Sequence, residues 1–126
     1  MGKPIRVLIA NRPRLMRELI LATFSEQPDI EIVDEVPEGA DILAWVEKAH
    51  PDFVVITQDT LGERPSVCDF VLHQNPNVRF IAIIPQHNFA VYYWASMKIN
   101  SCNFEASEKA ILGVLRDEGG AMSRTV

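Results

Sequence analysis

The chain has 126 residues, of which 48% are hydrophobic and 23% are charged, and its formal net charge is −5 at pH 7. These values predict one globular domain with a core of ordinary size. No apolar run approaches the roughly 20 residues that a membrane-spanning helix needs, and the amino terminus lacks the apolar segment of a secretory signal. We therefore expect a cytoplasmic location with no membrane contact. Because Lys and Arg do not cluster, we do not expect this chain alone to bind nucleic acid.

The first half of the chain alternates between β-favouring runs and helical patterns. A short apolar run at residues 6–10 predicts a first strand. Leu15, Leu19, Ile20 and Phe24 then fall on one face of a helix that spans about residues 14–26. Residues 28–33 predict a second strand, and the apolar residues of segment 42–46 predict a second helix.

The second half continues the alternation. Residues 51–56 contain four consecutive apolar residues, which is typical of a central strand buried on both faces. A third helix is predicted around residues 67–71, a fourth strand at 76–84, a fourth helix at 91–96 and a weak fifth strand at 101–104. Ser107 is predicted to cap a last helix that ends at Gly119 and Gly120. Residues 1–118 are thus expected to form one domain, and residues 119–126 a flexible tail.

Strands and helices at this spacing predict an α/β fold with a parallel sheet and helices on both faces. The six glycines are scattered, so the chain has neither a P-loop nor a dinucleotide-binding fingerprint. The two cysteines, Cys68 and Cys102, are too few for a disulfide framework or a zinc site, and the histidines lack ligand spacing. We therefore expect no enzymatic activity, no metal and no other cofactor.

Four segments together carry a resemblance to a known family: I-R-V-L-I-A-N-R-P-R-L-M-R-E-L, P-D-I-E-I-V-D-E-V, P-D-F-V-V-I-T and P-N-V-R-F-I-A-I-I. Residues 5–118 resemble a response-regulator receiver domain, most closely the kind that precedes helix-turn-helix output domains. This resemblance implies a flavodoxin-like three-layer sandwich with a five-stranded parallel sheet in the order 2-1-3-4-5. It also implies that the first and fifth helices cover one face and the other three helices the opposite face.

The resemblance does not extend to the residues of the family's phosphorylation site. Receivers hold Mg²⁺ with two acids after the first strand and accept phosphate on an Asp that ends the third strand. A Thr or Ser ends their fourth strand, and an aromatic in the fifth strand is followed by a Lys. The corresponding residues here are Asn11, Arg12, Thr57 and Ile84, and residues 102–106 supply neither the aromatic nor the Lys. The resemblance thus implies a degenerate phosphorylation pocket.

The chemistry of these residues agrees with that interpretation. Mg²⁺ prefers carboxylate ligands, and the guanidinium of Arg12 would oppose a divalent cation in the same place. Thr57 cannot form an acyl phosphate. Asp59, two residues further on, is interpreted as a displaced acceptor, a loop acid or a partner of Arg12. We hypothesise that Arg12 occupies the cation site and hydrogen-bonds Thr57 or Asp59.

The segment F-A-V-Y-Y-W at residues 89–94 is unusually aromatic. A helix that covers a sheet buries about one apolar stripe, so some of these side chains are expected to be exposed on the predicted fourth helix. Exposed aromatics are frequent anchors of protein interfaces. The sequence therefore predicts contact with a protein partner or a second copy of the chain through Phe89, Tyr92, Tyr93 and Trp94.

These observations together predict a pseudo-receiver of bacterial signal transduction that acts through phosphorylation-independent protein contact, including dimerisation. Two alternatives remain open. One is a conventional phosphorelay receiver that uses Asp59 or Thr57. The other is a sensor that binds a small ligand or nucleotide at the carboxyl-terminal mouth of the sheet.

Overall fold

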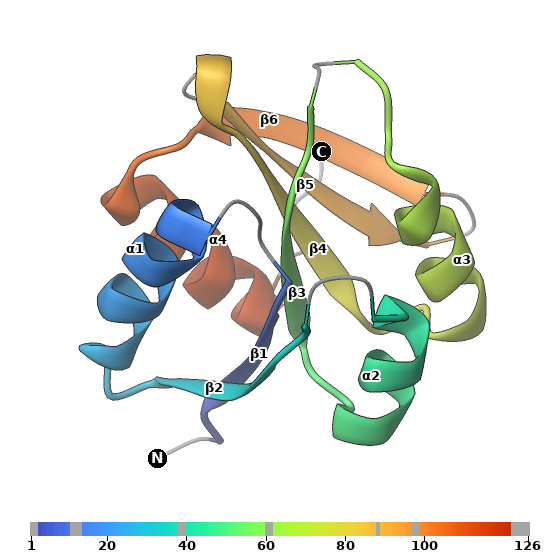
Figure 1. Cartoon of the computed structure of the whole chain (residues 1–126), viewed down its shortest axis with the longest axis horizontal. Helices are drawn as coiled ribbons and strands as arrows, with labels where there is room; N and C mark the ends of the chain where they lie inside the picture. The colour runs from blue at the N-terminus through green and yellow to red at the C-terminus, as the bar shows by residue number, and fades with distance from the viewer. Residues whose placement is uncertain are drawn as a thin grey trace.

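A computed structural model describes residues 3–10, 14–37, 40–59, 62–87, 89–96 and 99–121, with backbone alone for 14–17 and 117–121. Within these residues one six-stranded sheet has the order β2-β1-β3-β4-β5-β6, with helices on both faces (Figure 1). The strands are β1 (Ile5–Ile9), β2 (Ile30–Glu35), β3 (Phe53–Thr57), β4 (Arg79–Ile84), β5 (Phe89–Ala95) and β6 (Ile99–Glu105). The helices are α1 (Arg14–Ser25), α2 (Ile42–Ala49), α3 (Ser66–Gln74) and α4 (Glu108–Ala121), with a 3-10 turn η1 (Pro85–His87).

The centre of the sheet is parallel and buried on both faces. β1 pairs in parallel with β2 and β3, and β3 pairs in parallel with β4. Phe53 and Val55 of β3 enter one apolar core, while Val54 and Ile56 enter the other. This alternation is the period of two that an extended strand imposes on its side chains. The predicted two-sided central strand is confirmed.

The helices form two layers (Figure 1). α1 and α4 cover one face, where Phe24 and Leu115 are fully buried in the first core. α2 and α3 cover the other face, where Val46 and Val71 enter the second core. The predicted α/β architecture and the strand order 2-1-3-4-5 are therefore confirmed, as is the placement of the first and last helices on one face.

The predicted fourth helix is wrong. Residues 89–95 form β5, which runs antiparallel to β4, and β6 runs antiparallel to β5. Parallel strands need a crossover of about a dozen residues or more, whereas β4 ends at Ile84 and β5 begins at Phe89. Aromatic and β-branched side chains also favour strands over helices. The all-parallel sheet is thus wrong at this edge, and the strand predicted at 101–104 is a sixth strand.

The aromatic side chains of β5 are mostly buried. Tyr92 points into the core under α1 and α4, and Tyr93 into the core under α2 and α3. Trp94 is half-buried and stacks on Tyr92 at 4.9 Å between ring centroids. Phe89, at 37% exposure, is the most accessible of the four. The prediction of an aromatic helix face is therefore wrong, because a strand between two cores buries alternate side chains on opposite faces.

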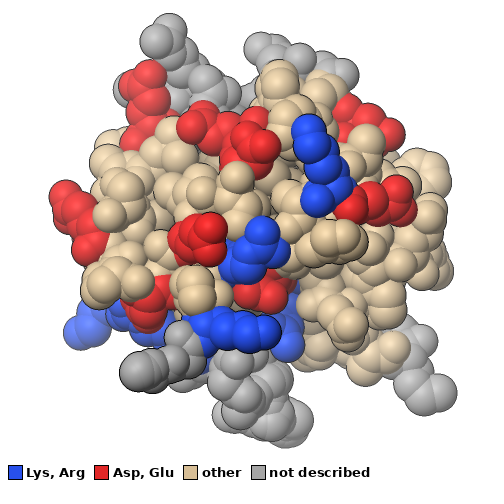
Figure 2. All heavy atoms as spheres, turned by 90° about the horizontal axis from the view of Figure 1, so that it is seen from below, with Lys and Arg blue, Asp and Glu red and all other residues tan. Residues whose placement is uncertain are grey.

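Charged side chains of both signs mix at the end of the molecule where β1 and β3 begin (Figure 2). Arg116 of α4 donates hydrogen bonds from Nε to Asp29 Oδ2 at 2.8 Å and from Nη2 to Gln27 Oε1 at 2.9 Å. The hydrogen bond from Arg116 lowers the pKa of the Asp29 carboxyl. Both partners are nearly half exposed, so we expect this pair to stabilise the fold only weakly.

The last helix is longer than the sequence predicted. α4 continues through Gly119 and Gly120 to Ala121, past the predicted end of the helix. Glycine costs a helix roughly 1 kcal/mol relative to alanine but does not forbid it. Residues 122–126 of the predicted tail lie outside the described residues. No helix in the described segments is long and apolar enough to span a membrane.

A matched pair of phenylalanines tests the core under α2 and α3. Phe80 of β4 is fully buried, whereas Phe70 of α3 is 65% exposed. We expect Phe80→Ala to lower the free energy of unfolding by about 3–5 kcal/mol, because it leaves a cavity. Phe70→Ala should change it by no more than about 0.5 kcal/mol. Urea unfolding of both variants measures the difference, and equal losses would contradict the described packing.

Candidate functional site

The predicted site lies where β1, β3 and β4 reach their carboxyl ends. Thr57 is the last residue of β3 and pairs with Ile83 of β4. Its side chain is half-buried, whereas Asp59 is exposed two residues beyond the strand. Ile84 ends β4 and is fully buried in the core under α2 and α3. Three of the predicted pocket residues thus gather at this mouth, although Ile84 contributes to the core.

The first strand approaches the same mouth. The Ala10 N–H, just past β1, donates a hydrogen bond to Val55 O at 2.8 Å, which holds the end of β1 beside β3. Asn11 and Arg12 follow at once in the sequence, but both lie outside the described residues. The predicted contact of Arg12 with Thr57 or Asp59 therefore stays a prediction.

The residue after Thr57, Gln58, takes part in a buried hydrogen bond that could not be predicted from the sequence. Gln58 is only 3% exposed, and the Tyr93 hydroxyl donates to its Oε1 at 2.8 Å. The Gln58 N–H donates to Ile83 O at 2.9 Å. Burial raises the pKa of the Tyr93 hydroxyl, and the hydrogen bond to Gln58 opposes this effect. The residue after Thr57 is thus fixed to β4 through its backbone and to β5 through its side chain.

Further polar groups lie beside α3, where Arg64 and Asp69 line a cavity together with Ser96 at the end of β5. Arg64 donates from Nε to Asp69 Oδ1 at 2.6 Å, and this hydrogen bond lowers the pKa of the Asp69 carboxyl. Cys68, between them in the sequence, is buried, and burial raises the pKa of its thiol to about 12. A thiol with that pKa stays protonated near neutral pH, so Cys68 is a core residue and not a nucleophile.

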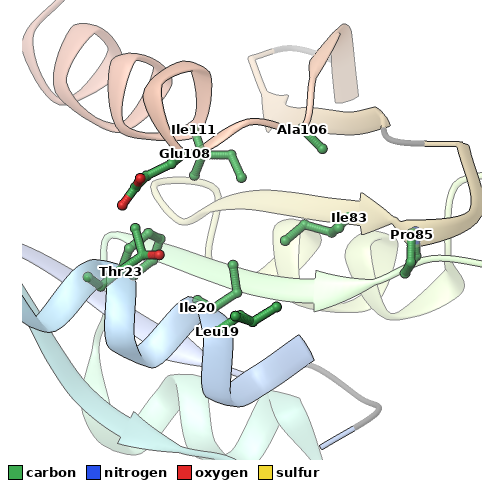
Figure 3. A pocket seen from close by; sticks show the side chains of 9 residues that line it. Leu19, Ile20, Thr23, Ile83, Pro85, Ala106, Glu108 and Ile111 are labelled. Atoms are coloured by element: carbon green, nitrogen blue, oxygen red, sulfur yellow. The ribbon is translucent and has the colours of Figure 1, made fainter. Parts of the chain in front are cut away.

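A cavity of about 280 Å³ opens between α1, α4 and the sheet (Figure 3). Its lining is mostly apolar, with the hydroxyl of Thr23 from α1 and the carboxyl group of Glu108 from α4. The lining residues are Leu19, Ile20, Thr23, Phe24, Ile83, Pro85, Ala106, Glu108 and Ile111. Small-molecule sites are usually apolar clefts of about 300 Å³ or more with a few polar groups, so this cavity is at the lower limit of size.

The side chains of the described segments contain no group of three or more His, Cys, Asp or Glu that could hold a metal ion. Asp59 is exposed in the loop after β3, and Asp69 of α3 pairs with Arg64. Within the described part of the chain, the arrangement supplies hydrogen-bonding groups and an apolar cavity.

A comparison with solved structures finds a protein of similar fold. The signal receiver domain of the response regulator NarL from Mycobacterium tuberculosis superimposes with a TM-score of 0.56. The match covers 66% of this chain and 68% of that domain, at 21% sequence identity. No protein-family model matches the chain. The chain therefore has a receiver-like fold, as the sequence resemblance implied.

Curated proteins match the chain over a shorter stretch. Protein-glutamate methylesterase/protein-glutamine glutaminase of Pyrococcus horikoshii is 29% identical over 56 residues. The second enzyme of that name from Koribacter versatilis is 36% identical over 53 residues. These matches cover 44% and 42% of this chain, and the chain spans only 15% of the length of each relative. The activities in those names describe the relatives.

The Tyr93–Gln58 hydrogen bond can be tested by a double-mutant cycle. Tyr93→Phe removes the hydroxyl donor, and we expect it to lower the free energy of unfolding by about 1 kcal/mol. Gln58→Met alone should also destabilise the protein, and Tyr93→Phe should cost less in the Gln58→Met background. The predicted coupling is about 0.5 kcal/mol or more, measured by urea unfolding. Strictly additive losses would show that the bond contributes nothing.

Proposed function

We propose that this chain is a pseudo-receiver, a signalling module with a receiver-like fold that works through protein contact instead of aspartyl phosphorylation. The observation that carries the proposal is Thr57, which ends β3 at the mouth of the sheet. A receiver forms an acyl phosphate on a carboxylate in that place. A threonine hydroxyl can form only a phosphoester, and it needs an activating base to do so.

The rest of the mouth supports this proposal. The residues after β1 are Asn11 and Arg12 in the sequence, so the two acids that would hold Mg²⁺ are replaced. Ile84 offers no hydroxyl at the end of β4. Gln58 is hydrogen-bonded to Tyr93 inside the core, which favours a single conformation of the residue next to Thr57. A pocket built in this way fits a fixed binding module better than a switch.

We also propose a partner and a location for this module. We propose that the partner is a protein, including a second copy of the chain, and that the module acts in the bacterial cytoplasm. Acidic and basic side chains are both present on the face in Figure 2, which does not favour a polyanion there. We propose no catalytic activity, no cofactor and no membrane or direct nucleic-acid contact for this chain.

Intact-mass spectrometry tests the proposal. The protein is incubated with acetyl phosphate and Mg²⁺ beside a phosphorylation-competent receiver as the positive control. We expect no mass increase for this chain, because it lacks the carboxylate nucleophile and the acids that hold the metal. A stoichiometric gain of one phosphoryl group would refute the pseudo-receiver. Thr57→Ala and Asp59→Asn variants would then show whether Thr57 or Asp59 is the acceptor of a conventional receiver.

The variant Thr57→Asp sharpens the same experiment. It restores a carboxylate at the end of β3, but the sequence around it still lacks the metal-binding acids and carries Arg12. We expect the new carboxylate to remain unphosphorylated, because transfer also requires a bridging cation. Rapid phosphorylation of Thr57→Asp would show that the remaining pocket is competent.

A small-ligand sensor is the second candidate function, and the cavity in Figure 3 favours it. In a thermal-shift screen of small apolar molecules, a true ligand would raise the melting temperature with concentration. Ala106→Leu would place a larger side chain in the cavity and should remove that rise. If no compound shifts the wild-type protein, or if Ala106→Leu responds equally, this candidate is wrong.

A further inference from the structure

The two edges of the sheet differ in how they are protected against pairing with other strands. β2 forms one edge and carries three acids in six residues, Glu31, Asp34 and Glu35. Its register with β1 is also irregular between Val7 and Leu8. Charges and bulges are the usual means by which proteins block an edge strand. This edge is protected.

β6 forms the opposite edge and has almost none of this protection. It pairs with β5 in unbroken register over all seven residues, from Ala95↔Ile99 to Phe89↔Glu105. It contains no Pro, Lys or Arg, and its single charged residue, Glu105, lies at its end. Among the described residues no strand lies beyond it. An edge strand turns alternate N–H and C=O groups away from its neighbour, so β6 presents a regular and nearly uncharged template.

We propose that β6 pairs antiparallel with β6 of a second copy of the chain, which joins the two sheets across a two-fold axis at Cys102. This inference rests on the proposed function, that the module acts through protein contact, and it names the partner and the surface. Such strand addition is a recurring mode of recognition in which main-chain hydrogen bonds supply the affinity. The occupant of the edge is thus a second copy of this chain.

The sequence of β6 suits pairing with itself. Cys102 is the central residue of Ile99–Glu105, so a symmetric pair places the two Cys102 side chains opposite each other. Ser101 then faces Asn103, and Asn100 faces Phe104. Glu105 of each copy faces Ile99, so no like charges meet, whereas like charges directly opposite would destabilise the pair. A pair of single strands is small, and small interfaces are typical of weak and transient association.

Oxidative cross-linking provides the first test. Cα atoms of opposite residues in an antiparallel pair are about 4.5–5.5 Å apart, within the roughly 4.4–6.8 Å that a disulfide spans. Cys102 is exposed and Cys68 is buried. Diamide, which takes two electrons and two protons from a pair of thiols, should therefore yield a covalent dimer on a non-reducing gel. Cys102→Ser should lose this product and Cys68→Ala should retain it; the reverse would overturn the proposal.

Charge substitutions at the two-fold axis provide a matched test that does not depend on oxidation. Cys102→Lys and Cys102→Asp each place like charges opposite one another, so each alone should weaken self-association about tenfold or more. An equimolar mixture should restore association, because Lys then faces Asp. Sedimentation velocity measures this, and circular dichroism verifies that both variants are folded. If either variant associates as the wild type does, or if mixing restores nothing, β6 is not the contact.

The outcomes separate this inference from the proposed function. A wild-type protein that stays monomeric at high concentration and takes up no phosphoryl group would overturn the β6 dimer and leave the pseudo-receiver standing. A phosphoryl gain would overturn the pseudo-receiver whatever the state of association. The wild-type protein could instead be a monomer that binds a different protein, with this binding lost in Cys102→Lys. That outcome would show that another chain uses this edge, and it also overturns the second-copy proposal.

Discussion

The rest of the structure depends on the burial of β3 on both faces and along both edges. Phe53 and Val55 support the layer of α1 and α4, while Val54 and Ile56 support the layer of α2 and α3. β1 pairs with residues 53–55 of β3 on one side, and β4 pairs with all five residues of β3 on the other. A strand held in this way ends sharply, and its end fixes where Thr57 and Gln58 lie.

Most of the fold could be predicted because each element carries its own signal. Four apolar residues from Phe53 to Ile56 mark a central strand without reference to any other segment, and the same holds for the apolar face of α1. β5 could not be predicted in this way, because a short aromatic run fits both a helical and an extended period. Two features of the sheet make this segment a strand: the connection after Ile84 is short, and the backbone of β4 needs a hydrogen-bonding partner on that side. Both are properties of the assembled sheet.

The candidate site was also only partly predictable from the sequence. Thr57 and Ile84 could be placed from the sequence, since each ends an apolar run. The hydrogen bond between Gln58 and Tyr93 could not, because it joins residues 35 apart and requires Tyr93 to face the core from a strand. Tyr92 and Tyr93, which suggested a surface, instead pack into the two cores, and the more exposed strand beside them is the polar β6. In this molecule, exposure followed strand position more than hydrophobicity.

The antiparallel hairpins β4–β5–β6 also have a consequence for how the chain folds. Their pairings connect neighbours in sequence, whereas Arg6 at the start of β1 meets Asp52, 46 residues away. Local pairings close small loops and form faster than distant parallel ones. During synthesis, however, β1 and β3, which are paired over this long distance, emerge from the ribosome before the hairpins. β3 gains its second neighbour only after β4 emerges. We therefore expect the native sheet to form late in synthesis, starting from the carboxyl-terminal hairpins.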